Sequence, residues 1–319
     1  MAVGNKSDFV INDAIASFAY IEKLSQMTDA FNEASNGTII LTTESVIGDF
    51  EKQDFFKEMA ESTMAKERDP LALTEITPEK LEQISNINVK LNRYSFISNT
   101  LDSFKKKGWT ADTFSMLAGE AAAMASISDK LNTLLAAGMG AIGSETDMVL
   151  GDGLSDIAYE DFPTVLGLYG DALDSIDLIV MHSSTYYKLM GTAVAEKLWN
   201  VAGMTINEGA NPTFSIPTLV TDSDSLSMTA GKGMLFLTNN ALVAVDSEVV
   251  TIDSGTKRGI ENILLEIQTE YAYTARIKGY SFTEGTASPA RATLADPASW
   301  TKSATSLKNT AGAIFNTLT

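Results

Sequence analysis

The segment NILLEIQTEYAYTARIKGYSF, residues 262–282, constrains the fold most, because its alternation predicts a very long strand. Its apolar face is formed by Ile263, Leu265, Ile267, Tyr271, Tyr273 and Ile277. Its polar face is formed by Glu266, Gln268, Glu270, Thr274, Arg276 and Lys278. An unbroken strand of about 20 residues spans ~65 Å, whereas strands usually have about 3 to 10 residues. A compact enzyme rarely needs such an element, so the pattern favours a subunit that neighbouring copies cover.

A second long element is predicted at residues 111–140, ADTFSMLAGEAAAMASISDKLNTLLAAGMG. Asp112 can cap a helix here and Gly138 can end it. The helical spacing predicts a core stripe of Phe114, Leu117, Ala121, Met124, Leu131 and Leu135. About 25 residues in a helix extend ~37 Å, so we expect a spine-like helix.

The first hundred residues combine a partly helical arm with a charged, irregular region. The arm, residues 8–35, ends at the turn signal of Asn36 and Gly37. Thr77 and Pro78 predict the start of a short helix. Further on, Ile87, Val89 and Leu91 alternate, and after a one-residue slip Tyr94 and Phe96 follow, which predicts a half-buried strand with a bulge at the slip.

The middle of the chain has an α/β pattern. We expect a helix at 162–175, a buried strand at 177–182 and a helix at 184–201 capped by Ser183 or Ser184. TFSIPTLVTD predicts a further strand, and in GMLFLTNNALVAVDS the pair Asn239 and Asn240 predicts a hairpin turn.

Charge and composition exclude several classes of function. A net charge of −18 repels phosphate and anionic lipid, so nucleic-acid binding gains no support. Because the chain has no cysteine, disulfides and thiolate metal sites are impossible. We find no secretory signal, and the longest weakly polar run, LNTLLAAGMGAIG, is shorter than the ~20 residues of a membrane span. We therefore expect synthesis in the cytoplasm and no membrane partner.

His182, the only histidine, is predicted where a strand meets a helix, a place where α/β folds often bind ligands. Ser183, Ser184 and Asp177 lie near it and invite a comparison with a catalytic triad. Adjacent residues at a strand end point in different directions, however, so a structural histidine is the favoured interpretation.

Other motifs give weak signals for chemistry. Gly138, Gly140 and Gly143 match a dinucleotide fingerprint by letters but follow a helix instead of a strand. The TAGKGM around Lys232 lacks phosphate-loop spacing and predicts a turn, and DSDSLSMTAGKG lacks calcium-loop ligands. The carboxylates of GDGLSDIAYEDF are typical of solvated surface. We therefore predict no enzyme activity, no catalytic residue, no cofactor and no metal.

Three stretches carry a resemblance to a known family. They are Gly170-Asp171 with Ile176 and IVMHSSTYYKL (179–189), the early FNEASNGTIIL, and the late DPASWTKSATSLKNTAGAIF. With the spine helix, they resemble the major capsid proteins of tailed bacteriophages, which have the HK97-like fold.

The resemblance implies an α+β fold in six parts. They are an N-terminal arm (1–37), an extended E-loop (38–108), a P-domain spine helix (109–142), an α/β A-domain (143–254), the long P-domain strand (255–283) and a C-terminal segment (284–319). His182 and its two serines would belong to the framework of the A-domain.

The resemblance also implies function and partners. Self-assembly into hexamers and pentamers would build an icosahedral phage head, first as a procapsid in the host bacterial cytoplasm, then as a virion shell enclosing double-stranded DNA without specific binding. A separate scaffolding protein and a portal are the expected partners, and a decoration protein is left open. Some relatives cross-link a lysine of the E-loop; the candidates here would be Lys52, Lys57, Lys66, Lys80 and Lys90. None is distinguished, so we predict no cross-link.

Three alternatives stay open at this point. An encapsulin-like compartment shares the fold and encloses enzymes instead of DNA. An α/β enzyme would depend on His182 alone. A cell-surface lattice or filament protein fits the acidic, cysteine-free composition but needs a secretion route.

Overall fold

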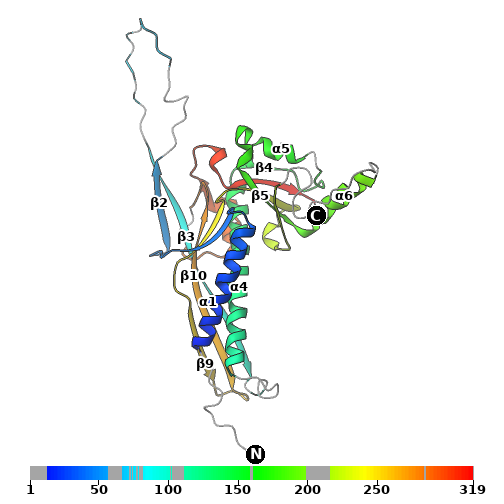
Figure 1. The fold of residues 1–319 in the computed structure, drawn as a ribbon. Coiled ribbons are helices and arrows are strands. Elements are labelled where there is room, and N and C mark those ends of the chain that lie inside the picture. The colour runs from blue at the N-terminus through cyan, green and yellow to red at the C-terminus, as the bar shows by residue number, and fades with distance from the viewer. Residues whose placement is uncertain are drawn as a thin grey trace, which may run out of the picture.

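The computed structural model describes residues 13–56, 67–71, 73, 75–76, 78, 82–100, 102, 111–158, 161–198, 216–283 and 285–318. Its helices are α1 (Asp13–Ala34), α4 (Ala111–Gly143), α5 (Asp161–Gly167), α6 (Ser183–Leu198) and α7 (Arg291–Ala295). Its strands are β1 (Ile39–Thr43), β2 (Phe50–Phe56), β3 (Gln83–Thr100), β4 (Val149–Leu150), β5 (Ile176–His182), β6 (Thr218–Thr221), β7 (Lys232–Thr238), β8 (Leu242–Asp246), β9 (Thr251–Lys257), β10 (Leu264–Ile277), β11 (Tyr280–Phe282), β12 (Trp300–Lys302) and β13 (Gly312–Thr317). Figure 1 shows a long lobe containing α1, α4 and β10, an α/β lobe beside it, and an extension that continues β2 and β3.

A six-stranded sheet forms the long lobe. Its order is β1-β8-β10-β3-β2, and β9 also pairs with β10. The helices α1 and α4 pack against each other on this lobe, and α4 contacts β10 (Figure 1). They come very close at Gly119, where an added Cβ would lie 2.3 Å from the carbonyl oxygen of Ala16. Glycine therefore permits the approach of the two helices.

The long strand is shorter than the sequence predicts. β10 ends at Ile277, and Gly279, with φ +78°, turns the chain into β11. A left-handed residue cannot continue a regular strand, so the expected 20-residue element is divided at this glycine. Within β10 the predicted apolar face is confirmed, because Leu265, Ile267 and Tyr273 are buried, whereas Ile263, before the strand, is exposed.

β3 is longer and more regular than expected. It pairs with β10 without interruption from Val89 opposite Ala275 to Thr100 opposite Leu264, so the predicted bulge is wrong. Because side chains alternate across an unbroken strand, Tyr94 and Phe96 lie on the face opposite Val89 and Leu91. They are 73% and 49% exposed, respectively.

α4 is also longer than predicted and buries a different stripe. It continues past Gly138 to Gly143. Of the predicted stripe, Phe114 and Leu135 are buried, whereas Leu117 and Met124 are exposed. Small residues such as Ala118 are buried in their place. Periodicity indicates an apolar face but does not decide which of two apolar faces a neighbour covers.

The α/β lobe contains a five-stranded sheet of order β4-β13-β7-β5-β6. The predicted strand before His182 and the helix after Ser183 are confirmed as β5 and α6, while the helix predicted at 162–175 consists of α5 and a 3-10 segment, Gly170–Ser175. The predicted hairpin at Asn239 and Asn240 is wrong. β7 pairs with β5 and β13, while β8 pairs with β1 and β10, so this turn connects two different sheets.

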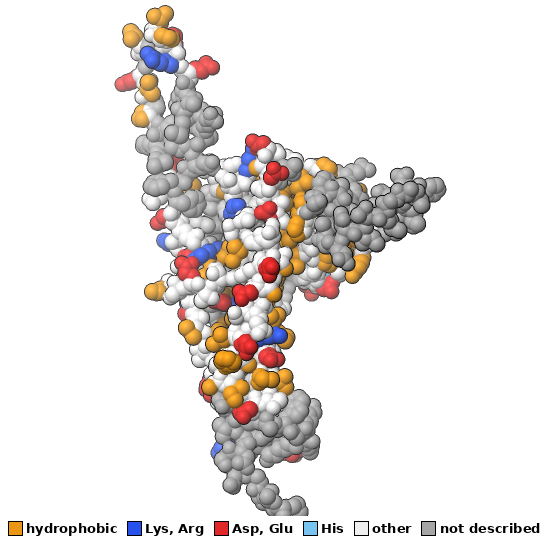
Figure 2. All heavy atoms as spheres, in the orientation of Figure 1, with side chains coloured by type: hydrophobic (Ala, Val, Ile, Leu, Met, Phe, Trp, Pro, Cys, Tyr) orange, Lys and Arg blue, Asp and Glu red, His pale blue; other side chains and the backbone are white. Residues whose placement is uncertain are grey.

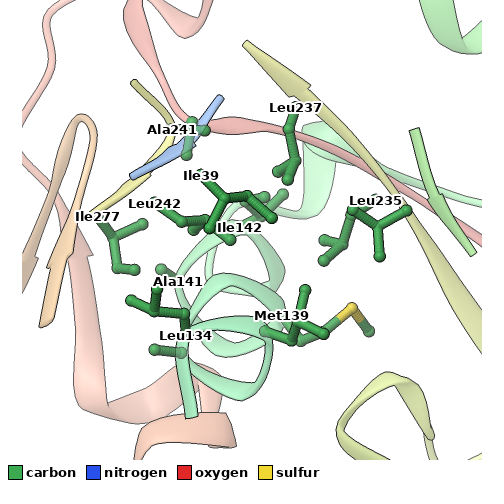
Figure 3. Packing of buried hydrophobic residues seen from close by; sticks show 14 of the residues in the cluster. Ile39, Leu134, Met139, Ala141, Ile142, Leu235, Leu237, Ala241, Leu242 and Ile277 are labelled. Carbon is green, nitrogen blue, oxygen red and sulfur yellow. The ribbon is translucent and has the colours of Figure 1, made fainter. Parts of the chain in front are cut away.

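One core joins the two lobes. Figure 3 shows Ile142 and Leu134 of α4 near Leu242 and Ile277 of one sheet and Leu235 of the other. The C-terminal half of α4 is thus buried on all sides, which accounts for its continuously apolar sequence. The helix predicted at Thr77 and Pro78 lies largely outside the described residues. No helix in the described ranges is long and apolar enough to cross a membrane.

Candidate functional site

His182 lies at the end of β5, as predicted, and its ring caps the next helix. The backbone N–H of Ser184 donates to His182 Nδ1 at 3.2 Å, and the Ser184 hydroxyl lies 2.8 Å from the same nitrogen. A nitrogen that accepts from a backbone N–H is unprotonated, so the hydroxyl also donates to it. The contact satisfies a donor at the start of α6, so the cap predicted at Ser183 or Ser184 is wrong and the His182 ring takes that role.

Ser183 and Asp177, which the sequence places near His182, are not arranged around its ring as in a catalytic triad. The Ser183 hydroxyl donates to Asp222, not to the histidine. Asp177 lies five positions earlier on β5, and no described carboxylate hydrogen-bonds to His182. The Ser184 hydroxyl and the ring are within hydrogen-bond reach, but among the described residues no third group orients the imidazole as in a catalytic triad.

The glycines of GMGAIG serve helix packing. Gly138 and Gly140 lie inside α4, where the fingerprint would need a strand followed by a helix. An added Cβ at Gly140 would lie 2.2 Å from the carbonyl oxygen of Leu294, and one at Gly138 would lie 3.0 Å from Leu242. The two glycines allow α7 and β8 to approach the spine helix.

The remaining polar motifs make local contacts. Lys232 begins β7 and donates to Ser227 Oγ at 2.7 Å, so TAGKGM is the predicted turn. In the acidic loop, Asp156 pairs with Lys188 at 2.8 Å and Asp161 accepts from the backbone N–H of Ala158. Across the described residues, no group of three or more His, Cys, Asp or Glu side chains could hold a metal ion.

Two of the lysines considered for cross-linking are described. Lys52 is exposed on β2. Lys90 is buried, and its ammonium pairs with Glu248. The positions of Lys57, Lys66 and Lys80 lie outside the described residues.

The first candidate interaction surface is the extension beyond β2 and β3. Leu71, Leu73 and Ile76 are 90%, 103% and 86% exposed there. Large apolar residues are commonly exposed singly, but here three within six positions of the sequence are almost fully exposed, and no described residue covers them.

The second surface lies on α1 and α4. Phe18 and Ile21 of α1 and Met116, Leu117 and Met124 of α4 are exposed. Figure 2 shows hydrophobic side chains gathered over the lower part of the long lobe, where both helices begin. We call these five residues the helix face. Glu22, Asp29, Asp112 and Glu120 lie on the same two helices.

A polar cluster fixes the sheet to the spine helix. Asp129 of α4 accepts hydrogen bonds from Tyr273 at 3.0 Å and Tyr271 at 3.3 Å, and from Arg291 at 2.7 Å. Burial, together with the negative Asp129, raises the pKa of both tyrosines. The cluster joins α4, β10 and the segment that begins α7, so it is structural.

Sequence reasoning located His182 correctly and missed both surfaces. The signal for the helix face was present, since Met116, Leu117 and Met124 are large apolar residues on a helix whose smaller residues are buried. The extension lacked a comparable signal, because its exposed leucines look like ordinary core residues in a sequence.

Comparison with known proteins agrees with an assembling subunit. A family model described as Gp13-like, major capsid protein 13-like, matches residues 8–314. A comparison with curated proteins found no match.

Solved structures of similar fold come from phages. The one titled Microbacterium phage Oxtober96 has a TM-score of 0.54 and 11% identity, covering 89% of this chain and 90% of the other. Mycobacterium phage Cain gives 0.52 and 10%, covering 89% of each chain. The capsid of Myoviridae Phage XM1 gives 0.50 and 13%, covering 76% of this chain and 86% of the other.

Proposed function

The chain belongs to the major capsid protein 13-like family and is a structural coat protein with an HK97-like fold, and from this premise we propose how it builds a shell. We propose that copies form hexamers and pentamers that close into an icosahedral head around double-stranded DNA. The protein is a component of the virion capsid, and we place its assembly in the host bacterial cytoplasm.

The observation that carries the proposal is apolar surface on parts that project from the core. The extension presents Leu71, Leu73 and Ile76 to water, and the helix face presents five more large apolar side chains. A monomer gains nothing from such surfaces, whereas burying each side chain against a neighbour gives about 1.5–3 kcal/mol. Repeated several times per subunit, such contacts hold a closed shell together.

We propose that the six-part division of the chain describes its working parts. Residues 38–108 supply the E-loop, and 109–142 and 255–283 supply the P-domain. The pairing of β8 and β9 with β10 supports adding these two strands to the P-domain sheet. The pairing of β13 with β7 supports a role for the C-terminal segment in completing the A-domain, 143–254.

The acidic charge bears on how the shell would enclose its DNA. With a net charge of −18, the wall would enclose DNA without binding it, because like charges repel. A separate scaffolding protein and a portal would direct closure. We propose no enzymatic role: His182 is a helix cap, and neither the enzyme nor the encapsulin-like alternative gains support from the family match.

Negative-stain electron microscopy with sedimentation of the purified protein tests the proposal. We expect closed shells, or rings of six and five subunits. A monodisperse monomer or dimer that persists when a scaffolding protein from the same phage is supplied would contradict it. Denaturing gel electrophoresis of mature particles tests the absence of cross-links, since a ladder of covalent multimers would contradict that expectation.

A further inference from the structure

The outer edge of β3 is paired only over its first part. β2 pairs with β3 up to Val89, while β10 covers the other side as far as Thr100. Beyond Val89, Ser288 Oγ accepts from the N–H of Asn92 at 3.0 Å and donates to its carbonyl at 3.3 Å. The backbone groups of Asn92 therefore face away from β10.

Three more residues of β3 also direct their backbone N–H and C=O groups away from β10. In an antiparallel pair, every second residue directs both its N–H and its C=O to the same side, so Tyr94, Phe96 and Ser98 also face outward. Within the described ranges, no group hydrogen-bonds to the backbone of these three residues. The outward N–H of Thr100 is already bonded to the side chain of Asn99 at 2.8 Å.

The sequence of this edge lacks the usual protection against pairing. Residues 94–100, YSFISNT, contain no charge, proline or glycine, whereas exposed edges in native proteins commonly carry charged residues or proline. The strand β2, which also has only one partner in the described sheet, carries Glu51, Lys52 and Asp54. A hollow of about 280 Å³ lies next to Tyr94, and its lining is mixed, with Arg93 and Glu270 beside Val249.

We propose that the edge of β3 from Tyr94 to Ser98 accepts an extended segment of a second copy of this chain as an added strand. The proposal rests on the proposed function, because a shell supplies copies at high local concentration. The edge strand carries no charge between Tyr94 and Thr100, and the carboxylates nearest to it in the sheet, Glu266 and Glu270, lie one strand further in on β10. A strand of a second copy can therefore pair with this edge without placing a carboxylate of β3 in the new ladder.

Amide hydrogen exchange with residue resolution tests the proposal directly. In the free subunit, the amides of Tyr94, Phe96 and Ser98 should exchange fast while those of Ser95 and Ile97, bonded within the sheet, exchange slowly. In assembled particles containing this chain alone, the three outward amides should slow at least tenfold. Equal fast exchange in both states would overturn the inference while leaving shell formation established.

A matched pair of variants at Ser98 separates backbone pairing from side-chain contact. Ser98→Ala and Ser98→Pro both remove the hydroxyl, but only proline removes the outward N–H, to which no described residue hydrogen-bonds. We expect both variants to fold with similar melting temperatures. Ser98→Ala should assemble like the wild type, whereas Ser98→Pro should need about tenfold more protein to assemble.

The controls distinguish failure of strand addition from failure of the proposed coat function. If both variants assemble like the wild type, strand addition at this edge is wrong and the coat function is unaffected. If wild-type protein never assembles even when a scaffolding protein from the same phage is supplied, the proposed function fails first. If Ser98→Pro does not fold, Phe96→Lys replaces it, because an exposed lysine blocks edge pairing and keeps the intramolecular bonds.

Discussion

At the scale of single residues, glycines determine how closely loops approach β13. Gly151 and Gly231 both have positive φ, +82° and +79°. A Cβ at either would lie 2.2 Å from a backbone carbonyl oxygen, that of Asn316 or Thr317. A side chain at either position is disfavoured for two reasons: the left-handed backbone conformation and the short distance to the neighbouring strand.

Gly231→Ala should therefore destabilise the subunit by about 2 kcal/mol or more, since both strain and a backbone clash must be relieved. Urea unfolding of the free subunit measures the change. Gly191→Ala is the control: Gly191 lies inside α6 with nothing within 4 Å of an added Cβ, so alanine should stabilise by up to about 1 kcal/mol. Equal effects at the two sites would disprove the packing argument.

Buried tyrosines predict sensitivity to alkaline pH. Burial raises the pKa of Tyr20 and of Tyr169 to about 12, and it also raises the pKa of Tyr271, Tyr273 and Tyr280. A folded pKa above the unfolded value of ~10 gives stability that is complete below pH ~10 and is lost as pH rises through the folded value.

The melting temperature should thus fall steeply between about pH 10 and 12. Tyrosinate absorbance near 295 nm and circular dichroism, followed on the same samples, check this. The late-ionising tyrosines should titrate together with loss of structure. Ionisation of every tyrosine at about pH 10 in a folded subunit would contradict the burial seen here.

At the scale of elements, a buried ion pair connects the spine helix to the sheet. Lys130 of α4 lies 2.6 Å from Asp246 of β8, and its side chain is only 3% exposed. Its ammonium also lies 6.0 Å from the centre of the Tyr271 ring. Removing one member leaves a buried charge without its partner, which costs more than removing both.

We expect Asp246→Ala to destabilise by about 3 kcal/mol, and the double variant Lys130→Met with Asp246→Ala to recover most of that loss. Chemical denaturation of Asp246→Ala, of Lys130→Met and of the double variant gives the free energies of unfolding for a double-mutant cycle. If the double variant loses the sum of the two single losses, the pair is not coupled and the assignment is wrong.

Elements whose signals are local were predictable, and those set by distant partners were not. β5 and α6 follow from a short apolar run, a serine at the helix start and helical spacing, all within thirty residues. The pairing of β8 was not accessible, because Asn239 and Asn240 suit a hairpin equally well, and only β1 and β10 decide where Leu242–Asp246 lies. For His182, the place was predicted but the cap partner, the N–H of Ser184, required coordinates.

At the scale of the whole molecule, surface that the subunit leaves uncovered should govern assembly and not folding. Leu71, Leu73 and Ile76 add nothing to the core, so replacing all three with serine should leave the melting temperature of the free subunit unchanged. Assembly should fail or need at least about a hundredfold more protein, since each lost apolar contact costs 1 kcal/mol or more.

Light scattering with electron microscopy measures this, and Leu154→Ser is the control. Leu154 is an exposed leucine on a loop of the α/β lobe, so its loss tests whether any exposed leucine matters. Normal shells from the triple variant would show that the extension is not an assembly contact.

The position of β13 has a consequence during translation. β13 lies between β4 and β7 in the α/β sheet, yet it is built from Gly312–Thr317, which the ribosome adds after all its sheet partners. A nascent chain released before these residues has a vacant place in its sheet, with the edges of β7 and β4 unpaired. Unfinished chains therefore cannot adopt the shape of a shell subunit, and the order of synthesis itself screens which molecules enter the wall.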